Sequence, residues 1–398
     1  MARSAGASTI LLLSLLGCSG DPAPAPLEPV RFDMTVSVAP GEELLACQFV
    51  RMPADESFVS GGSYATSDGT HHFLLFRTAP DMPEQELGRV VDCNEGEGLM
   101  RYERGYVSGG QLPEDDGDFP TGLALAFAPD EVLLMQMHVL NSSQATVEAS
   151  ASIELRRVAA EQVTARVGTL RFYNPFIYVP AGGASRAAMR CPTGPTDITL
   201  LTAGAHMHAR GVAYRAYADI AGEPRATEPF YSTTEWQHPD YYAGLLPLPA
   251  GSDLRFECDY ENSEARDVVQ GRTAADEMCM LSAFYYPAQD YDTEICARMD
   301  EHGTQDRNCA QTLSCIQLCS PDDLPRFDEG DATVGACFQK CIVESCPNVS
   351  GALFPELLCS QAHCQDACAT FGAACSQCVA AQCKAELDAC QALACDGQ

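Results

Sequence analysis

Residues 197–220 read DITLLTAGAHMHARGVAYRAYADI, and this stretch contains two short runs in which apolar and polar residues alternate. The runs Asp197–Leu201 and Val212–Ile220 have the period of two that is typical of β-strands. Similar runs recur between residues 30 and 297, separated by Gly, Pro, Asn and Asp. Strands at this spacing favour β-sandwiches. A break around residues 157–167 would divide the region into two units of similar size.

Histidine is rare in the chain, and its placement is informative. Five of the eight histidines fall in apolar, strand-like runs: His71, His72, His138, His206 and His208. His206 and His208 are two residues apart and therefore project from one face of a strand, and the same holds for Gln136 and His138. His71 and His72 are adjacent, so both can face one metal only at a strand end or a bulge. A core histidine with satisfied hydrogen bonds is the alternative for any one of them, but the three groups together favour a site for copper, zinc or iron.

Composition excludes several classes of partner. The chain has 24 Lys+Arg and 55 Asp+Glu, a formal net charge of −31. Proteins that bind nucleic acid need clustered positive charge, so no nucleic-acid partner is expected. The same balance excludes docking on an anionic membrane through basic residues. The 21 cysteines indicate an oxidising compartment, where most would form disulfides.

The start of the chain predicts export. A short apolar run, Ile10–Leu16, precedes Gly17-Cys18 and is too short to span a bilayer as a stable helix. The segment resembles a bacterial lipobox, which implies a signal peptide at residues 1–17 and lipidation of Cys18. Residues 18–29 then form a Pro-rich tether. Ser19 favours the outer membrane, facing the periplasm or the cell surface. The alternative is an ordinary secretory signal with a chance cysteine.

The chain changes character near residue 300. Fourteen cysteines follow, and strand-like alternation disappears. Cys315 and Cys319 are four residues apart, as are Cys337 and Cys341, so each pair shares a helix face. Two disulfides between antiparallel helices would join the pairs. A looser second copy starts near Cys359, which suggests tandem repeats of six and eight cysteines. The alternatives are a copper–thiolate store or, less favoured, a zinc site; protein contact or protection at the cell surface would be the role of a disulfide-bonded module.

Four segments together resemble a known family. They are THHFLLF at residues 70–76, LMQMH at 134–138, AHMHARG at 205–211 and DEMC at 276–279. In this order they are similar to segments of the copper type II, ascorbate-dependent monooxygenases, the family of peptidylglycine α-hydroxylating monooxygenase and dopamine β-monooxygenase. The resemblance covers roughly residues 30–297.

The resemblance implies a fold and a set of disulfides. The fold is mainly β, with two tandem jelly-roll-like sandwich domains at residues 30–160 and 161–298. The resemblance says nothing about the tail, where the cysteine spacing predicts a small α-helical, disulfide-rich module at 299–398. The implied pairs are Cys47–Cys93, Cys191–Cys296 and Cys258–Cys279.

The resemblance also implies two copper sites on either side of a solvent-filled cleft. An electron-storing copper would be held by His71, His72 and His138, and an oxygen-activating copper by His206, His208 and Met278. The thioether of Met278 is a soft ligand that favours Cu(I). Gln136 would order water or substrate between the metals, or is simply a polar strand residue. The cofactors are therefore two coppers per chain and ascorbate or a similar one-electron reductant.

The sequence departs from the family at the residues that recognise substrate. Phe73 stands where relatives often have methionine. Gly204 replaces an arginine, and Met280 and Ser282 replace an asparagine and a tyrosine, so a peptide carboxylate anchor is missing. Met207 and Met280 line an apolar pocket or pack in the core. His238 lies outside every motif and is expected in a loop.

Two functions follow from these observations. The first is a copper monooxygenase that hydroxylates an aliphatic C–H bond of a small molecule with O2. The second is a non-catalytic copper-binding or adhesion lipoprotein that keeps the sandwich fold. The presence of all six proposed ligands favours the enzyme.

Overall fold

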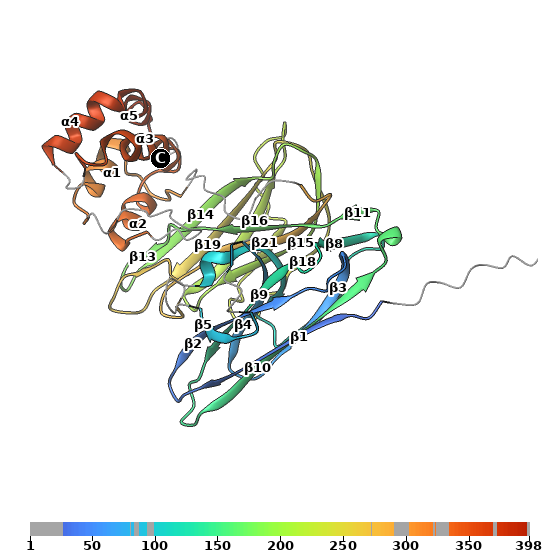
Figure 1. Ribbon diagram of the computed structural model, residues 1–398. Helices are drawn as coiled ribbons and strands as arrows, with labels where there is room; N and C mark the ends of the chain where they lie inside the picture. Colours follow the sequence, from blue (N-terminus) through green and yellow to red (C-terminus); the bar gives the residue numbers. More distant parts are fainter. Residues whose placement is uncertain are drawn as a thin grey trace, which may run out of the picture.

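The computed structural model describes residues 27–79, 81–82, 87–93, 99–271, 273–289, 302–320, 323, 334–368 and 372–395. The predicted signal peptide, Cys18 and most of the predicted tether lie outside these residues, and so does Cys296. The fold is mainly β with a small helical region, as predicted (Figure 1). None of the described helices is both long and apolar enough to span a membrane.

The first sandwich is built from two mainly antiparallel sheets. One sheet has the order β1 (Val30–Val38), β10 (Val147–Val158), β3 (Ser57–Thr66), β8 (Leu123–Phe127) and β11 (Ala165–Arg166), with β7 (Glu114–Asp118) paired to β3. The other has the order β5 (Val90–Asp92), β2 (Glu43–Arg51), β9 (Val132–Leu140), β4 (Thr70–Thr78) and β6 (Glu103–Gly110). Two short 3-10 helices, η2 (Leu99–Tyr102) and η3 (Ala160–Gln162), complete this part.

Strand β9 shows how the sequence positions the site. Met135 and Met137 point into the core between the two sheets. The alternation of a strand therefore turns Gln136 and His138 to the opposite face. That face is also buried: Leu134 packs in a second cluster with Phe49 and Phe76 of the first sandwich, and the His138 ring lies among the other histidines. Strand β9 is therefore buried along almost its whole length.

The second sandwich has two sheets as well, each with four strands. One has the order β12 (Gly168–Tyr173), β21 (Cys279–Tyr286), β15 (Ile198–Met207) and β18 (Tyr242–Leu248). The other has the order β14 (Ala184–Pro192), β19 (Asp253–Glu261), β16 (Gly211–Asp219) and β17 (Tyr231–Thr233). A short ribbon of β13 (Tyr178–Val179) and β20 (Val268–Val269) lies at one end.

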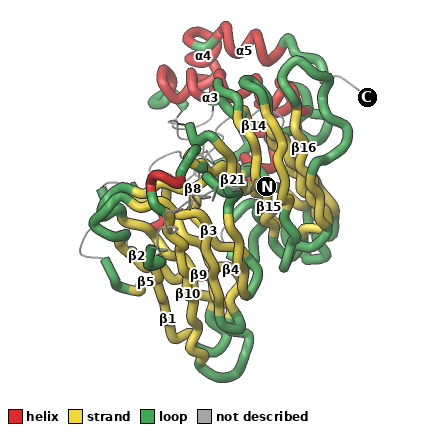
Figure 2. The backbone as a smooth tube through the Cα atoms, turned by 90° about the vertical axis from the view of Figure 1, so that its right-hand side faces the viewer, coloured by secondary structure: helices red, strands yellow, loops and turns green. Residues whose placement is uncertain are grey.

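The two sandwiches pack face to face through sheet β12–β21–β15–β18 (Figure 2). A register shift in β15 between Leu200 and Thr202 marks a bulge at Leu201. Leu201 packs into the core cluster of the first sandwich, together with Phe284 and Tyr286 of β21. The face of β15 and β21 that does not serve the second core is therefore an interface.

Five helices form the predicted C-terminal module at one end of the molecule, next to β13 and β14 (Figure 1). They are α1 (Cys309–Ile316), α2 (Ala336–Val343), α3 (Pro347–Cys364), α4 (Ala373–Gln382) and α5 (Lys384–Gln391). The expected pair of disulfides is present as Cys315–Cys341 and Cys319–Cys337, although α1 ends at Ile316 and Cys319 lies in the turn that follows it.

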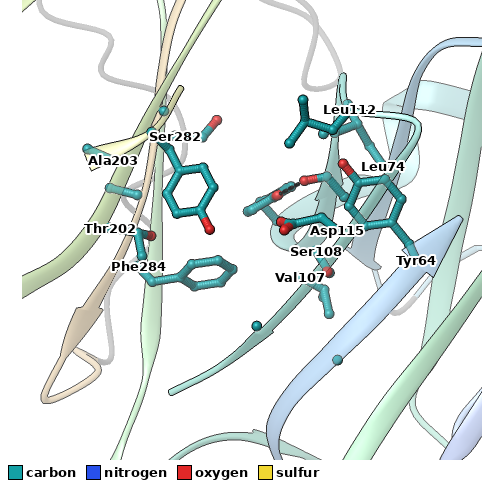
Figure 3. A pocket seen from close by; sticks show the side chains of 18 of the residues that line it. Tyr64, Leu74, Val107, Ser108, Leu112, Asp115, Thr202, Ala203, Ser282 and Phe284 are labelled. Atoms are coloured by element: carbon teal, nitrogen blue, oxygen red, sulfur yellow. Dashed lines mark hydrogen bonds between the residues drawn. The ribbon is translucent and has the colours of Figure 1, made fainter. Parts of the chain in front are cut away.

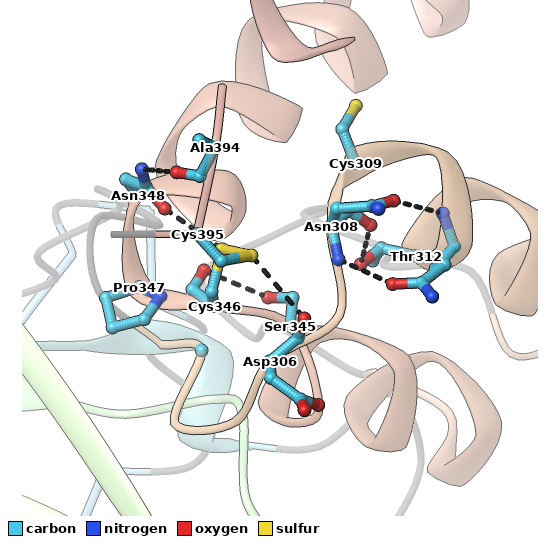
Figure 4. The surroundings of a disulfide bond; sticks show 12 residues. Asp306, Asn308, Cys309, Thr312, Ser345, Cys346, Pro347, Asn348, Ala394 and Cys395 are labelled. Carbon is cyan, nitrogen blue, oxygen red and sulfur yellow. Dashed lines mark hydrogen bonds between the residues drawn. A yellow bond between two sulfur atoms is a disulfide. The ribbon is translucent and has the colours of Figure 1, made fainter. Parts of the chain in front are cut away.

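The six and eight cysteines do not form separate closed repeats. Six of the eight cysteines in the second group pair with one another, as Cys359–Cys383, Cys364–Cys378 and Cys368–Cys375. Two further bonds join the groups, namely Cys309–Cys390 and Cys346–Cys395, of which Figure 4 shows the second. All fourteen cysteines are paired, which leaves no thiolate for a copper or zinc store.

The β region contains the pairs Cys47–Cys93 and Cys258–Cys279, the partners that the resemblance implies. Cys191 is disulfide-bonded. Its implied partner, Cys296, lies outside the described residues.

Candidate metal centre

A bulge brings the adjacent residues His71 and His72 to one side of β4. The register of β4 against β9 shifts between Thr70 and His72, which leaves His71 as the extra residue. The two imidazole centroids lie 5.3 Å apart. The bulge that two neighbouring histidines need in order to face one metal is therefore present.

His138 on β9 is the cross-strand neighbour of His72. Their ring centroids are 5.1 Å apart, and His138 lies 5.4 Å from His71. Gln136, on the same face of β9, accepts a hydrogen bond from His72 Nε2 at 2.9 Å. Gln136 thus supports a histidine ring, and it is absent from the described residues that line the adjacent cavity.

His206 and His208 lie at the end of β15 on one face, with ring centroids 5.2 Å apart. The following turn is fixed by Glu277, a fully buried residue. Its carboxylate accepts hydrogen bonds from the backbone N–H groups of His208 at 3.0 Å and Arg210 at 2.9 Å. Because Glu277 directly precedes Met278, this carboxylate ties the His-x-His segment to the methionine.

The five histidines form one cluster that spans both sandwiches. The centroid of His206 lies 5.6 Å from that of His72 and 5.9 Å from that of His71. Ligand atoms of His71, His72 and His206 all lie within 4.8 Å of one another. The open, solvent-filled cleft that the resemblance implies is therefore closed between these rings.

Two side chains of the first sandwich hold the cluster closed. Glu43 accepts hydrogen bonds from His138 Nε2 at 2.7 Å and from the backbone N–H of Ala274 at 2.9 Å. Gln111 Oε1 accepts from His206 Nδ1 at 3.0 Å, and its Nε2 donates to the backbone oxygen of Trp236 at 3.0 Å.

The hydrogen bonds fix which nitrogen is free in four of the five rings, those of His72, His138, His206 and His208. Carboxylate, amide and backbone oxygens only accept, so the ring nitrogen that faces one carries the proton. His72 and His138 use Nε2 in this way and leave Nδ1 free. His208 donates Nδ1–H to the backbone oxygen of Asp276 and leaves Nε2 free, and His206 does the same toward Gln111.

Three of these free nitrogens are buried without any hydrogen-bond partner: His72 Nδ1, His138 Nδ1 and His208 Nε2. Buried polar atoms in native structures are nearly always paired. Unpaired imidazole lone pairs within one cluster of rings are the donors that a metal ion requires, so the residues present fit a metal.

The electrostatics keep the rings neutral, as metal binding requires. Burial, followed by repulsion from His138 and His208, lowers the pKa of His71 to about 4. Burial likewise lowers the pKa of the other four histidines, and neighbouring imidazoles add to the effect in His72 and His206. Burial also raises the pKa of Glu277 to about 7, against the opposing hydrogen bonds from Arg210 and His208.

Comparison with known families agrees with this donor set. Residues 168–308 match the model of the copper type II ascorbate-dependent monooxygenase C-terminal domain. The matched range contains His206, His208 and Met278 and covers less than half of the chain. The match supports an oxidoreductase at the level of the family, while His71, His72 and His138 lie outside it.

Other comparisons add little. No curated protein matches the chain. A chain from the structure of Sulfolobus turreted icosahedral virus is 8% identical, with a TM-score of 0.18, over 63% of this chain and 58% of that one. A chain of the infectious bursal disease virus VP2 subviral particle is 9% identical, with a TM-score of 0.15, over 67% and 73%. TM-scores this low do not establish a shared fold.

A cavity of about 370 Å³ lies between the two sandwiches, beside the histidine cluster. His72, His206 and Met278 line it together, so the structure brings the proposed sulfur ligand to the same space as two of the histidines. The wall is largely aromatic and apolar, with Tyr64 and Phe284 facing one another across the space (Figure 3). Polar groups on one side come from Ser108 and Asp115.

The positions that depart from the family fall in different places. Phe73 is fully buried in the first core and points away from the histidines. Met207 packs in the second core, whereas Met280, Gly204 and Ser282 line the cavity. His238 is exposed in the loop that also carries Trp236, whose ring lies 6.1 Å from that of His71.

Sequence reasoning missed Glu43, Gln111 and Trp236. They come from segments without any motif. The pairing of β2 with β9 brings Glu43 to His138, whereas the packing of the two sandwiches brings Gln111 to His206 and Trp236 to His71. Glu277 had a signal, because it lies inside the segment that carries the methionine.

Proposed function

We propose that the protein is a copper-dependent monooxygenase that hydroxylates an aliphatic C–H bond of a small apolar or aromatic molecule, using O2 and a one-electron reductant of the ascorbate type. One observation carries the proposal: buried imidazoles with unpaired nitrogens belong to one cluster of rings, and two rings of that cluster, His72 and His206, line a cavity together with Met278. The family match of the second sandwich supports the same chemistry.

The chain's own residues would form two metal positions with different roles. Through their free nitrogens, His71, His72 and His138 would hold one copper, and His206, His208 and Met278 would hold the other. Bound copper would supply electron storage at the first position and oxygen activation at the second.

The surrounding residues orient the ligands and the substrate. Gln136 and Glu43 hold the rings of His72 and His138 by Nε2, so that Nδ1 of each ring stays available to a metal. Gln111 fixes His206. Support of this kind preserves ligand geometry and the correct tautomer.

The cavity defines the class of substrate. Its aromatic and apolar wall would take a small apolar or aromatic body and exclude water from the reacting C–H bond. Arg171 is the only cationic side chain among the described residues that line the cavity, and it is paired with Glu103. This lining argues against a peptide carboxylate as the recognised group.

Met278→Ile tests the proposal. It removes the sulfur donor but keeps most of the side chain's bulk, so the second copper should lose its soft ligand. The variant should keep close to one tightly held copper per chain and lose oxygen uptake that depends on ascorbate and is stimulated by substrate. A panel of small apolar and aromatic molecules serves as candidate substrates. X-ray absorption of the reduced parent should show a copper–sulfur contact that the variant lacks.

Met189→Ile is the matched control, because Met189 is fully buried in the core of the same sandwich, away from the cavity. It should retain copper content and uptake. Full activity in Met278→Ile would overturn the assignment of Met278. Copper binding in the parent without uptake stimulated by any member of the panel would favour the non-catalytic copper-binding function.

A further inference from the structure

The loop that leads to Met278 is closed at its base by a parallel β-bridge. It leaves β20 at Val269 and returns at Glu277, whose backbone N–H donates to Val269 O at 3.0 Å. Gly271 N donates to Glu277 O at 3.1 Å, and Gln270 and Glu277 form a β-bridge. The position of Met278 therefore depends on where this base is held.

A side chain of the helical module reaches the base. Gln339 of α2 is fully buried. Its Oε1 accepts hydrogen bonds from Gln270 N at 2.9 Å and Ile177 N at 3.2 Å. Its Nε2 donates to Val334 O at 2.7 Å, so both ends of the amide are used.

Apolar and polar contacts fix α2 at this place. The ring of Phe176, which precedes β13, lies 4.6 Å from that of His302 and 6.3 Å from that of Phe338. Lys340 donates to the hydroxyl of Tyr178 at 2.9 Å. The module and the β13–β20 ribbon thus share one core, which also includes Val269.

The base of the loop is joined directly to the metal centre. Glu277 accepts from the backbone N–H groups of His208 and Arg210, and Met278 follows it in the chain. A shift at Gln270 would move Glu277 through their shared bridge. Gln339 is therefore connected to the turn that presents His208 in three steps: its bond to Gln270, the bridge from Gln270 to Glu277, and the bond from His208 to Glu277.

We propose that the disulfide-bonded module supports the second metal position, with Gln339 as a positioning residue for the Met278 loop. The inference rests on the proposed function insofar as Met278 is a ligand. The physical reason is that Gln339 accepts from the buried N–H of Ile177 and from the partly buried N–H of Gln270, which also reaches Ile177 O at 3.3 Å. Loss of the amide weakens the hydrogen bonding of both donors, and poorly bonded donors drive local rearrangement.

Gln339→Leu tests the inference, because leucine is of similar size but accepts no hydrogen bond. In the metal-free protein, amide hydrogen exchange should become faster in segments 174–179 and 268–279. Copper affinity at the second position should fall about tenfold, the lower end of the range for lost supporting residues. The copper–sulfur signal of the reduced protein should weaken, whereas copper binding by the first sandwich should not change.

Gln339→Glu provides the rescue. Burial favours the protonated carboxyl, which offers an acceptor to Gln270 and Ile177 and a donor to Val334, as the amide does. This variant should restore slow exchange and the copper–sulfur signal. Ile342→Val is the control for general loosening of the module, because Ile342 is fully buried in the shared core on the same helix. It should leave the loop's exchange unchanged.

The outcomes separate the two proposals. Parent-like exchange in Gln339→Leu overturns the inference, whatever the copper does. Equal acceleration of the loop in Ile342→Val also overturns it, since the effect would then come from the module's stability. A parent without any copper–sulfur contact overturns the assignment of Met278 as a ligand, while the exchange data still decide whether Gln339 holds the loop.

Discussion

Glu43 is the residue that joins the two halves of the metal centre most directly. One carboxylate oxygen accepts from His138 of the first sandwich and from Ala274 of the loop that carries Met278. Burial raises the pKa of Glu43, but the hydrogen bonds from Ala274 and His138 outweigh this and leave it below its ordinary value. The carboxylate form is therefore the one that the site favours.

We expect Glu43→Ala to weaken copper binding at His71, His72 and His138 by about 10- to 100-fold, because His138 loses the acceptor that fixes its tautomer. Competition with a chelator of known affinity measures the change. Glu43→Gln keeps an acceptor oxygen and should lose much less. Equal affinities in the parent and both variants would contradict a supporting role for Glu43.

At this scale the sequence predicts some residues well and others not at all. Alternation along β9 and β15 is enough to place Gln136 with His138, and His206 with His208, on shared faces. The bulge at His71 can be stated as a condition but not located, since it depends on the register of β4 against β9. Glu43 and Gln111 cannot be predicted, because nothing local marks them: Glu43 meets His138 through the pairing of β2 with β9, and Gln111 meets His206 of the other sandwich.

At the scale of elements, the outer face of sheet β14–β19–β16–β17 carries a charged ladder. Asp259 on the central strand β19 accepts hydrogen bonds from Arg186 on β14 at 2.6 Å and from Arg215 on β16 at 2.6 Å. Burial raises the pKa of Asp259, but the two guanidinium groups outweigh it and hold the pKa below its ordinary value. The ladder therefore ties three strands together most strongly when Asp259 is ionised.

A carboxyl whose pKa is lower in the folded state stabilises the fold above its unfolded pKa, about 3.9 for Asp. This stability is lost as the pH falls through the folded value. Asp259→Asn should be about 0.5–1 kcal/mol less stable at neutral pH, since the pair is partly exposed. It should also lose less stability than the parent below about pH 4. Melting temperatures measured from pH 7 to pH 2 test this, and parallel curves for the two proteins would contradict it.

The helical elements show where cysteine spacing stops being informative. The i, i+4 pairs predict the disulfides between α1 and α2, because helix geometry places both sulfurs of a pair on one face. The bonds Cys309–Cys390 and Cys346–Cys395 have no such local signature. They span 81 and 49 residues and depend on how α5 packs beside α1.

At the scale of the whole molecule, we propose that the chain is exported and anchored to a bacterial membrane, the outer one, through lipidated Cys18. Its cofactor chemistry would then lie outside the cytoplasm. The nine disulfides between described cysteines are consistent with an oxidising compartment.

Cys18→Ser should abolish the lipid and release the protein into the soluble fraction outside the cytoplasm. Because Cys18 lies upstream of the sandwiches, copper content should be unchanged. Fractionation of membranes, together with mass spectrometry of the N-terminal peptide, measures both effects. A variant that sediments with membranes as the parent does would rule out the lipobox interpretation and leave an ordinary secretory signal.

The bonds from Cys309 to Cys390 and from Cys346 to Cys395 also set an order of assembly. A chain that emerges from its N-terminus can complete both sandwiches before Cys390 and Cys395 have been synthesised. Until then, Cys309 and Cys346 lack their native partners. They can form wrong disulfides with other cysteines, and these must be exchanged later. If Gln339 holds the Met278 loop, the module that closes last fixes a site that lies in a part of the chain made earlier. Cells that lack a disulfide isomerase would then accumulate protein whose first copper position is competent and whose second is not.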